Sequence, residues 1–308
     1  MPTISRRTAL KALGAVAAIG SISPLPLLTR QRKTQMPRAT GTALRIAHLT
    51  DVHVSPGNAS RRGLAACLRH VHSLPDAPDL ILNGGDAIGD ASRASAEETR
   101  GQWELWQRVM REECRLPIEH CLGNHDIWGG DRAKGKQWAL DSLGLAHRYR
   151  SFDRAGWHFI VLDSVTLTDD DYVARLDDEQ FDWLRRDLRA TDGETPVLIL
   201  SHIPILAACP LFDGDNEKTG RWVLPAGWMH VDARRLKDLF AKHANVKLCL
   251  SGHIHLRDRV EYAGVTYLCN GAVSGNWWDG AYQDCEPGYA LLDLHADGTF
   301  THQYTTYA

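Results

Sequence analysis

Apolar and polar positions alternate along most of the chain in two patterns. Short, mostly apolar runs are typical of buried strands, and longer stretches with apolar residues at every third or fourth position are typical of amphipathic helices. The short runs predict strands at 44–50, 79–83, 117–122, 157–163, 197–200 and 246–250. The longer stretches predict helices at 61–73, 96–114, 178–189 and 231–243. Strands and helices therefore alternate, as they do in an α/β protein.

The C-terminal part of the chain changes to hairpins. Two are expected, at 257–269 and 289–304, and their turns carry Gly264 and Gly298. Asp297-Gly298 between two apolar runs is a strong hairpin signal, and Ala263-Gly264 is a turn between the other two. Alternating units followed by hairpins predict mixed β-sheets with helices on the outside.

Composition places the 308-residue chain among globular proteins. Hydrophobic residues make up 44% of it, and a mean hydropathy of −0.31 excludes a polytopic membrane protein. Residues 1–38 hold seven basic and no acidic side chains, so residues 39–308 hold 28 basic against 38 acidic ones. A body this acidic is a poor binder of anionic polymers, and no nucleic-acid polymer is expected as a partner.

Residues 1–40 are predicted to be an export signal followed by a disordered linker. The adjacent Arg6 and Arg7 precede an uncharged run at 12–29 and resemble a twin-arginine signal. A membrane anchor and a disordered basic tail are the alternatives, but the run is short, Gly-rich and broken by proline, so no stable membrane span is expected. The prediction is export by the twin-arginine machinery to the periplasm or exterior of a bacterium, with a catalytic domain at 41–308.

The seven cysteines do not predict a disulfide framework. Their number is odd and no C-x-x-C pair occurs. Cys249 and Cys269 fall in apolar strand-like runs, where a cysteine is typically a small buried hydrophobe. One disulfide is compatible with an oxidising compartment, but a cysteine metal site is not indicated.

Five segments that follow predicted strands carry side chains able to bind metal ions. They are Asp51-Val52-His53, Gly84-Gly85-Asp86, Gly123-Asn124-His125-Asp126, Ser201-His202 and Gly252-His253-Ile254-His255. Any one of them alone is a weak signal, and a lone histidine is more often part of the core. Five in succession at strand ends, where sheet proteins gather their active sites, are hard to assign to packing.

The spacing within these segments suits two metal ions. In an extended segment side chains two apart point the same way, so Asp51 and His53 can converge. His253 and His255, with Cα atoms roughly 6.5 Å apart, can serve two ions about 3.5–4 Å apart. Carboxylate, imidazole and amide ligands without thiolate suit zinc, iron or manganese better than calcium or copper(I).

Together the five segments resemble the calcineurin-like metallophosphoesterase superfamily. Its pattern is D-x-H, G-D, G-N-H-[DE], H and G-H-x-H, and with the twin-arginine-like signal the chain resembles an exported bacterial member. The resemblance implies two mixed β-sheets packed as a sandwich flanked by helices. It also implies a hydrolase of phosphate esters with two transition metal ions, in which a hydroxide between the ions attacks phosphorus.

The resemblance also implies the roles of individual residues. The first ion would be held by Asp51, His53, Asp86 and His255. The second would be held by Asp86, Asn124, His202 and His253. Asp86 would bridge the two ions, and His125 would assist the leaving group.

One position departs from the family pattern. Many members place an acid three residues after the bridging aspartate, where it supports the G-N-H histidine. Here that position is Gly89, and Asp90 comes one residue later. Asp90 or Asp126 is therefore expected to orient His125.

The substrate is less closely indicated. The segment 275–280, with Trp277 and Trp278, resembles a loop of exported family members, and Trp128 follows the G-N-H motif. These three tryptophans are candidate substrate contacts, with packing as the alternative. No Arg or Lys within the motifs marks a terminal phosphate, which favours a phosphodiester slightly over a monoester. The other class of function considered is an exported, non-catalytic binding protein on the same fold.

Overall fold

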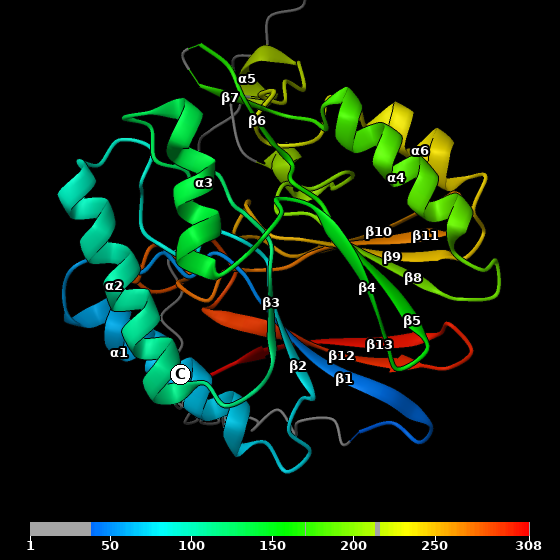
Figure 1. Ribbon diagram of the computed structural model, residues 1–308, viewed down its shortest axis with the longest axis horizontal. Helices are drawn as coiled ribbons and strands as arrows, with labels where there is room; N and C mark the ends of the chain where they lie inside the picture. The colour runs from blue at the N-terminus through cyan, green and yellow to red at the C-terminus, as the bar shows by residue number, and fades with distance from the viewer. Residues whose placement is uncertain (1–37, 170, 213–215, 308) are drawn as a thin grey trace, which may run out of the picture. The chain divides into compact units, whose positions relative to one another are not determined.

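The computed structural model describes residues 38–169, 171–212 and 216–307, so all but the last three residues of the predicted export signal and linker lie outside the described residues. No helix among those residues has the length and apolar character that a membrane span requires. The elements form two large sheets with helices packed on their outer faces, and a third sheet of two short strands (Figure 1).

The first sheet has five strands in the order β13-β12-β1-β2-β3. Their bounds are β1 Thr42–Leu49, β2 Leu80–Asn83, β3 Ile118–His120, β12 Gly288–His295 and β13 Phe300–Thr306. The strands β1, β2 and β3 are parallel, and β12 runs antiparallel to β1. Buried side chains of this sheet pack on those of α1 Asn58–Ser73, α2 Ala96–Glu113 and α3 Arg132–Leu143.

The second sheet has six strands in the order β10-β11-β9-β8-β5-β4. Their bounds are β4 Arg150–Arg154, β5 Trp157–Val161, β8 Val197–Leu200, β9 Val246–Ser251, β10 Asp258–Tyr262 and β11 Val265–Cys269. The four inner strands are parallel and the two edge strands antiparallel. Every residue of β5 and β8 is buried, because parallel strands covered on both faces read as continuous apolar runs. The helices α4 Asp178–Ala190 and α6 Ala233–Phe240 pack on the outer face of this sheet.

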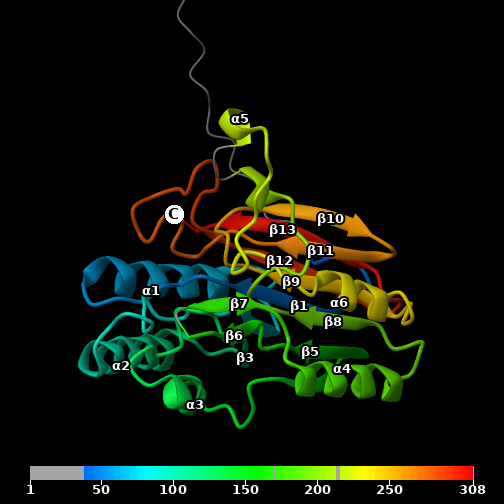
Figure 2. The same ribbon diagram turned by 90° about the horizontal axis from the view of Figure 1, so that it is seen from above.

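The two sheets face each other across a shared apolar core. Ile46 and Leu82 of the first sheet meet Phe159 and Leu200 of the second. Figure 1 shows the resulting layers, with α1 and α2 beside one sheet and α4 and α6 beside the other, and in Figure 2 the strands of the two sheets overlap in the view from above. The predicted α/β sandwich with flanking helices is confirmed.

Most predicted elements are present, and the differences lie where apolar periodicity is weak. The four short elements β6 Val165–Leu167, β7 Tyr172–Ala174, the 3-10 helix Cys209–Phe212 and α5 Asn216–Thr219 were not predicted. Neither were α3, in which Ala139 and Leu140 are the buried apolar residues, nor the edge strand β4. The seven cysteines are all unpaired, and no disulfide framework is present.

Candidate metal centre

The sandwich brings the five motif segments to one place. The strands β1, β2 and β3 are parallel neighbours in the first sheet, and β8 and β9 are parallel neighbours in the second. Each of the five is followed by one of the motifs, so their side chains meet beyond the carboxyl ends of the strands, as expected for parallel sheets.

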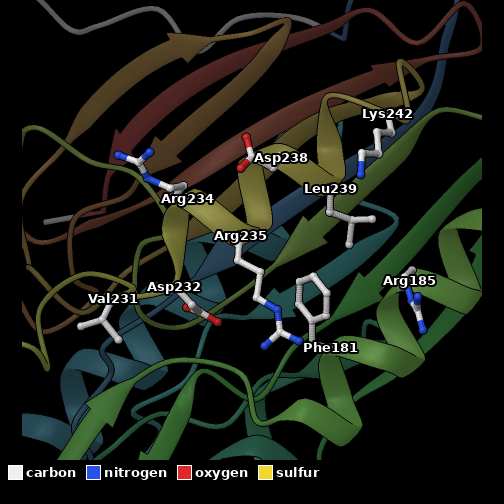
Figure 3. Close-up of a pocket in the computed structure, with 9 residues that line it drawn as sticks. All are labelled: Phe181, Arg185, Val231, Asp232, Arg234, Arg235, Asp238, Leu239 and Lys242. Atoms are coloured by element: carbon white, nitrogen blue, oxygen red, sulfur yellow. The ribbon is translucent and has the colours of Figure 1, made fainter.

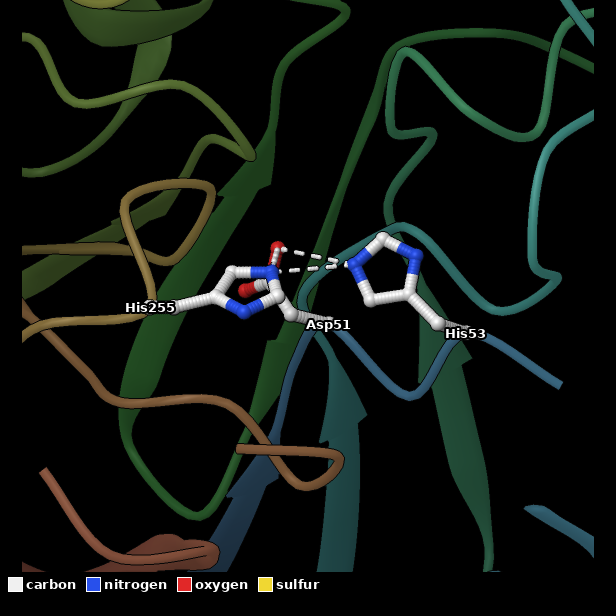
Figure 4. Close-up of side chains that lie close together, drawn as sticks. All are labelled: Asp51, His53 and His255. Carbon is white, nitrogen blue, oxygen red and sulfur yellow. Dashed lines mark hydrogen bonds and ion pairs between the residues drawn. The ribbon is translucent and has the colours of Figure 1, made fainter. Parts of the chain in front are cut away.

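A first group consists of Asp51, His53 and His255 (Figure 4). Nε2 of His53 lies 3.0 Å from Nε2 of His255, and Oδ1 of Asp51 lies 3.5 Å from the latter and 3.9 Å from the former. All three residues are buried. Two imidazole nitrogens and a carboxylate that face one point are a typical ligand set for a divalent cation.

A second group consists of Asp86, His202 and His253, whose candidate ligand atoms lie within 4.8 Å of one another. Oδ2 of Asp86 lies 3.2 Å from Nε2 of His202 and 3.8 Å from Nε2 of His53. The Asp86 carboxylate therefore stands between the two groups. Oδ1 of Asn124 lies 3.1 Å from Nε2 of His202, on the side of the second group.

The histidines are oriented by backbone carbonyls. Nδ1 of His53 faces Gly89 O at 3.4 Å, that of His202 faces Gly84 O at 2.9 Å, and that of His255 faces Gly275 O at 2.6 Å. A carbonyl oxygen can only accept a hydrogen bond, so each Nδ1 donates and the Nε2 atom of each ring is the one that faces the centre. This arrangement is typical of metal-binding histidines.

The convergence of these side chains was predicted, but the physical reason was wrong. The segments are not extended: φ is 54° at Asp51, 52° at His53, 52° at Asp86, 70° at His253 and 60° at His255. Non-glycine residues rarely adopt the left-handed region, and such strain is concentrated at functional sites. Left-handed turns, not the alternation of a strand, direct these side chains to the centre.

The ionisable groups of the centre perturb one another. Burial alone would lower the pKa of His202, but the charge of Asp86 and its hydrogen bond raise it to about 9, and Asp51 likewise raises the pKa of His255 above its usual value. Burial lowers the pKa of His53 to about 3, so its imidazole is neutral at pH 7. Burial alone would raise the pKa of Asp51, but the hydrogen bond and charge of His255 hold it below the usual range. Burial has the same effect on Asp86, and the charges of His202 and His125 bring its pKa well below the usual value. The carboxylates are therefore ionised.

His125 is paired with Asp90, one of the two expected partners. Oδ1 of Asp90 lies 3.3 Å from Nδ1 of His125. Burial alone would lower the pKa of His125, but the charges of Asp86 and Asp90 raise it above the usual value. Asp90 therefore makes the contact with His125 that many family members make from the preceding position, where this chain has Gly89.

Asp126, the other expected partner of His125, is occupied with the backbone. Its carboxylate accepts hydrogen bonds from the N–H groups of Gly123, Asp86, Ala87 and Ile88, at 2.8 to 3.3 Å. These bonds tie the second and third motif segments together. The pKa of Asp126 is raised to about 7 by burial and by the charge of Asp86.

The three candidate tryptophans lie in different surroundings. Trp277 is exposed and its ring centroid lies 3.7 Å from that of His53. Nε1 of Trp278 donates to the carbonyl of His53 at 3.0 Å, so Trp278 supports the loop. Trp128 packs against Trp138 and donates to a backbone carbonyl. Only Trp277 of the three has an exposed ring in contact with the site.

Two contacts were not predicted from the sequence. Ser274 Oγ donates to Asp51 O at 2.8 Å, which ties the loop before Trp277 to the first motif. The Tyr172 ring lies 6.3 Å from that of His253. Ser274 is 223 residues from Asp51, and Tyr172 lies on the unpredicted β7, so no local pattern indicated either contact.

The similarity to known proteins agrees with this geometry. Residues 44–257, well over half of the chain, match the calcineurin-like phosphoesterase family. The chain belongs to this family. It is a metal-dependent phosphoesterase.

Individual members of the family resemble the chain over most of its length. A 3′,5′-cyclic-nucleotide phosphodiesterase of Nostoc sp. is 28% identical over 271 residues, which cover 83% of this chain and 90% of the relative. The 3′,5′-cyclic adenosine monophosphate phosphodiesterase CpdA of Escherichia coli is 25% identical over 281 residues, or 86% and 90% of the two chains. A dimetal phosphatase from Danio rerio shares the fold with a TM-score of 0.65 at 14% identity, covering 87% and 97% of the two chains.

The residues of the phosphoesterase fit the two metal ions that its family uses. Both groups combine a buried carboxylate with imidazoles, and Nδ1 of His53, His202 and His255 is bonded to a backbone carbonyl, so that Nε2 of each faces the centre. Nε2 of His53 and Nε2 of His255 lie 3.0 Å apart beside the Asp51 carboxylate, so the three ligand atoms of the first group face one point. Carboxylate and imidazole donors are typical ligands of divalent transition metal ions.

A separate cavity of about 500 Å³ lies between α4 and α6 (Figure 3). Arg235 stacks over Phe181 within it, at 3.6 Å from the guanidinium carbon to the ring centroid, and pairs with Asp178. None of its lining residues belongs to the two metal groups, so this cavity is distinct from the phosphoesterase centre.

Proposed function

We propose that this phosphoesterase hydrolyses small phosphodiesters with two metal ions held at the two groups. The observation that carries the proposal is the position of Asp86, whose Oδ2 lies 3.2 Å from His202 Nε2 and 3.8 Å from His53 Nε2. A carboxylate between two ligand groups is suited to bridge two cations.

We assign the ligands by group. Asp51, His53, Asp86 and His255 hold the first ion. Asp86, Asn124, His202 and His253 hold the second. We expect manganese, iron or zinc. When bound, the cations supply positive charge for the phosphate oxygens and activate a water for attack on phosphorus near neutral pH.

The chain supplies the proton for the leaving group. His125 follows the ligand Asn124 and its ring centroid lies 5.2 Å from that of His53, so it stands beside the centre. Asp90 holds Nδ1 of His125, which leaves Nε2 to give a proton to the departing alkoxide. Asp90 is a positioning residue in this scheme, and Asp126 positions the motif segments through their backbone.

Two observations favour a diester over a monoester. Among the described residues, the hydrogen bonds and ion pairs of the two metal groups come from other side chains and backbone groups, and none comes from Lys or Arg. A dianionic terminal phosphate would favour such a cation. The relatives from Nostoc and Escherichia coli are named as cyclic-nucleotide phosphodiesterases.

The test compares turnover of bis-p-nitrophenyl phosphate, 3′,5′-cyclic AMP and p-nitrophenyl phosphate by the manganese-loaded protein. We expect the diesters to be hydrolysed with at least tenfold higher kcat/KM than the monoester, and the Asp86→Asn variant to hydrolyse none of them. Preference for the monoester would make the protein a phosphatase. Full metal loading without turnover of any ester would favour the non-catalytic binding protein.

We also propose that residues 1–40 direct the enzyme out of the cytoplasm through the twin-arginine machinery. The support is in the sequence: Arg6 and Arg7 stand before an uncharged run, and 1–38 lacks acidic residues. The periplasm or the cell exterior is the expected location.

A further inference from the structure

Trp277 combines exposure with contact to the metal centre. Its side chain is 45% exposed. Its ring centroid lies 3.7 Å from that of His53, 5.0 Å from that of His125 and 5.8 Å from that of His255. A large aromatic side chain that serves only packing is normally covered. Here one part of the indole covers a ligand histidine and the remainder is open to solvent beside the reacting groups.

The loop holds this indole in a strained and anchored position. φ is 51° at Trp277 and 73° at Trp278, in the left-handed region that bulky residues rarely adopt. The backbone N–H of Trp278 donates to Ser274 O at 2.8 Å, and its Nε1 donates to His53 O at 3.0 Å. Strain of this kind persists only where surrounding contacts impose it, and it is concentrated at ligand clamps and active sites.

The same loop supports the first metal group. Ser274 Oγ donates to Asp51 O, and Gly275 O accepts from His255 Nδ1. Trp277 lies next to these anchors in the chain. Its ring is therefore positioned with the metal ligands and does not need to be ordered when a substrate binds, which lowers the entropic cost of a contact.

Further aromatic rings lie around the centre. The Tyr282 ring centroid is 5.8 Å from that of His255, and the Tyr172 ring centroid is 6.3 Å from that of His253. Both tyrosines are half-buried. Aromatic surroundings favour flat apolar groups, because two π-systems stack with little loss of freedom.

We infer that Trp277 is a stacking platform for an aromatic ring of the substrate, placed on the side of the leaving alcohol. This rests on the proposed phosphodiesterase function and names its substrate class: phosphodiesters whose departing alcohol carries a nucleobase or an aryl ring. The side is set by His125, whose ring centroid is 5.0 Å from that of Trp277 and which protonates the leaving oxygen. Trp278 and Trp128, which are occupied with packing and backbone hydrogen bonds, are outside this platform.

The test compares Trp277→Leu, which covers His53 without a π-face, with Trp277→Phe, which keeps a ring. The substrates are bis-p-nitrophenyl phosphate for an aryl ring, 3′,5′-cyclic AMP for a nucleobase, and glycerophosphoethanolamine for a diester without a ring. For each substrate the kcat/KM of the variant is divided by that of the wild type, because this ratio cancels the differences in intrinsic reactivity among the three substrates. We expect Trp277→Leu to lose about 10- to 100-fold on ring-bearing diesters and less than about threefold on glycerophosphoethanolamine, with Trp277→Phe close to the wild type.

Tyr262→Leu serves as the matched control. Tyr262 is 51% exposed, lies at the far end of β10 and has no part in the site, so all ratios should stay near one. Equal losses of Trp277→Leu on all three diesters, with metal missing by elemental analysis, would overturn the inference and make Trp277 a cover for His53. A loss only on cyclic AMP would restrict the class to nucleotides, and a loss only on the p-nitrophenyl ester to aryl esters.

A binding measurement separates this inference from the proposed function. Phenylphosphonate and methylphosphonate are titrated into the metal-loaded protein by calorimetry, which requires no turnover. We expect the wild type to bind the phenyl compound about tenfold more tightly and Trp277→Leu to bind both equally. Equal binding by the wild type would overturn the platform whatever the enzyme hydrolyses. Preference for phenylphosphonate in a protein without esterase activity would overturn the proposed function and leave the platform standing.

Discussion

Oδ1 of Asp90 lies 3.3 Å from Nδ1 of His125. Asp90 is in turn held by Ser92, whose N–H and Oγ donate to the same oxygen at 2.8 and 2.6 Å. The carboxylate thus has a defined place one residue later in the chain than the family pattern leads one to expect. A turn of different length delivers the same contact to the histidine.

Removal of His125 should impair catalysis without removing metal. His125→Ala is expected to lower kcat by roughly 10²–10⁴-fold for esters with poor leaving groups, because the alkoxide then departs without a proton. The loss should be much smaller for p-nitrophenyl esters, whose leaving group is stable as an anion. Turnover numbers for both ester types and elemental analysis measure this.

Asp90→Asn tests the positioning role in the same assay. It should show the same dependence on the leaving group with a smaller loss, because the imidazole remains but is less well held. If His125→Ala instead loses activity equally on good and poor leaving groups and excess manganese restores it, His125 supports the second metal group and the acid role is wrong.

Neutralising the carboxylate between the groups should weaken both metal sites. We expect Asp86→Asn to abolish activity and to lower the occupancy of both ions, because an amide oxygen does not serve two cations as a carboxylate does. Asp51→Asn should loosen mainly the first ion. Elemental analysis after dialysis at equal metal concentration compares the two variants, and full occupancy by both ions in Asp86→Asn would refute the bridge.

The contact between α1 and the tryptophan loop should tolerate no added methyl group. A Cβ at Gly63 would lie 2.0 Å from the ring of Trp278, which also bonds to His53 O. Gly63→Ala should therefore destabilise the fold by roughly 1–3 kcal/mol and lower metal affinity. The control is Gly101→Ala in α2, where a Cβ meets nothing within 4 Å and should stabilise by roughly 0.5–1 kcal/mol. Thermal unfolding of both variants and of the wild type measures these changes in stability.

A buried ion pair near the start of the fold should make stability depend on pH. Asp293 accepts from Nε and Nη2 of Arg45 at 2.6 and 2.8 Å. Burial alone would raise the pKa of Asp293, but these bonds lower it below its usual 3.8. The stabilisation is therefore present above the unfolded-state pKa and is lost as pH falls through the folded-state pKa.

Asp293→Ala should cost roughly 3–5 kcal/mol at neutral pH, because it removes the carboxylate that pairs with the buried Arg45 guanidinium. The difference from the wild type should shrink on acidification. Denaturant unfolding from pH 7 to pH 3 at fixed metal content measures both. The double variant Arg45→Met with Asp293→Leu, which buries neither charge, should lose less than Asp293→Ala, and an equal or larger loss would contradict this account.

The export proposal predicts a response to the identity of two side chains rather than their charge. Changing Arg6 and Arg7 to Lys keeps both charges but alters an address read by a receptor. We expect the precursor to accumulate in the cytoplasm, as seen by cell fractionation. Complete export of the double variant would exclude the twin-arginine route, and general secretion or a membrane anchor would remain as explanations of the N-terminal segment.

Much of the fold and of the centre could be predicted from local patterns. Buried parallel strands are continuous apolar runs, so β5 and β8 were recognisable without their neighbours. The elements that escaped prediction have little apolar periodicity, as in α3, or lie at an edge, as in β4. Since each candidate ligand stands within four residues of the end of a strand, the parallel order within each sheet gathers the motifs at its carboxyl edge, and the packing of the two sheets joins them.

By itself, the sequence determined the ligand types, their order along the chain and the family they indicate, because these are contiguous with strands whose ends must meet. Only the tertiary structure decided how the side chains are aimed. The left-handed turn at Asp51, the choice of Asp90 over Asp126, and the separation of Trp277 from Trp278 depend on contacts such as that of Trp278 with His53, 225 residues apart. The direction of a side chain depends on its backbone dihedral angles and on the groups that pack against it. The residues next to it in the sequence determine neither.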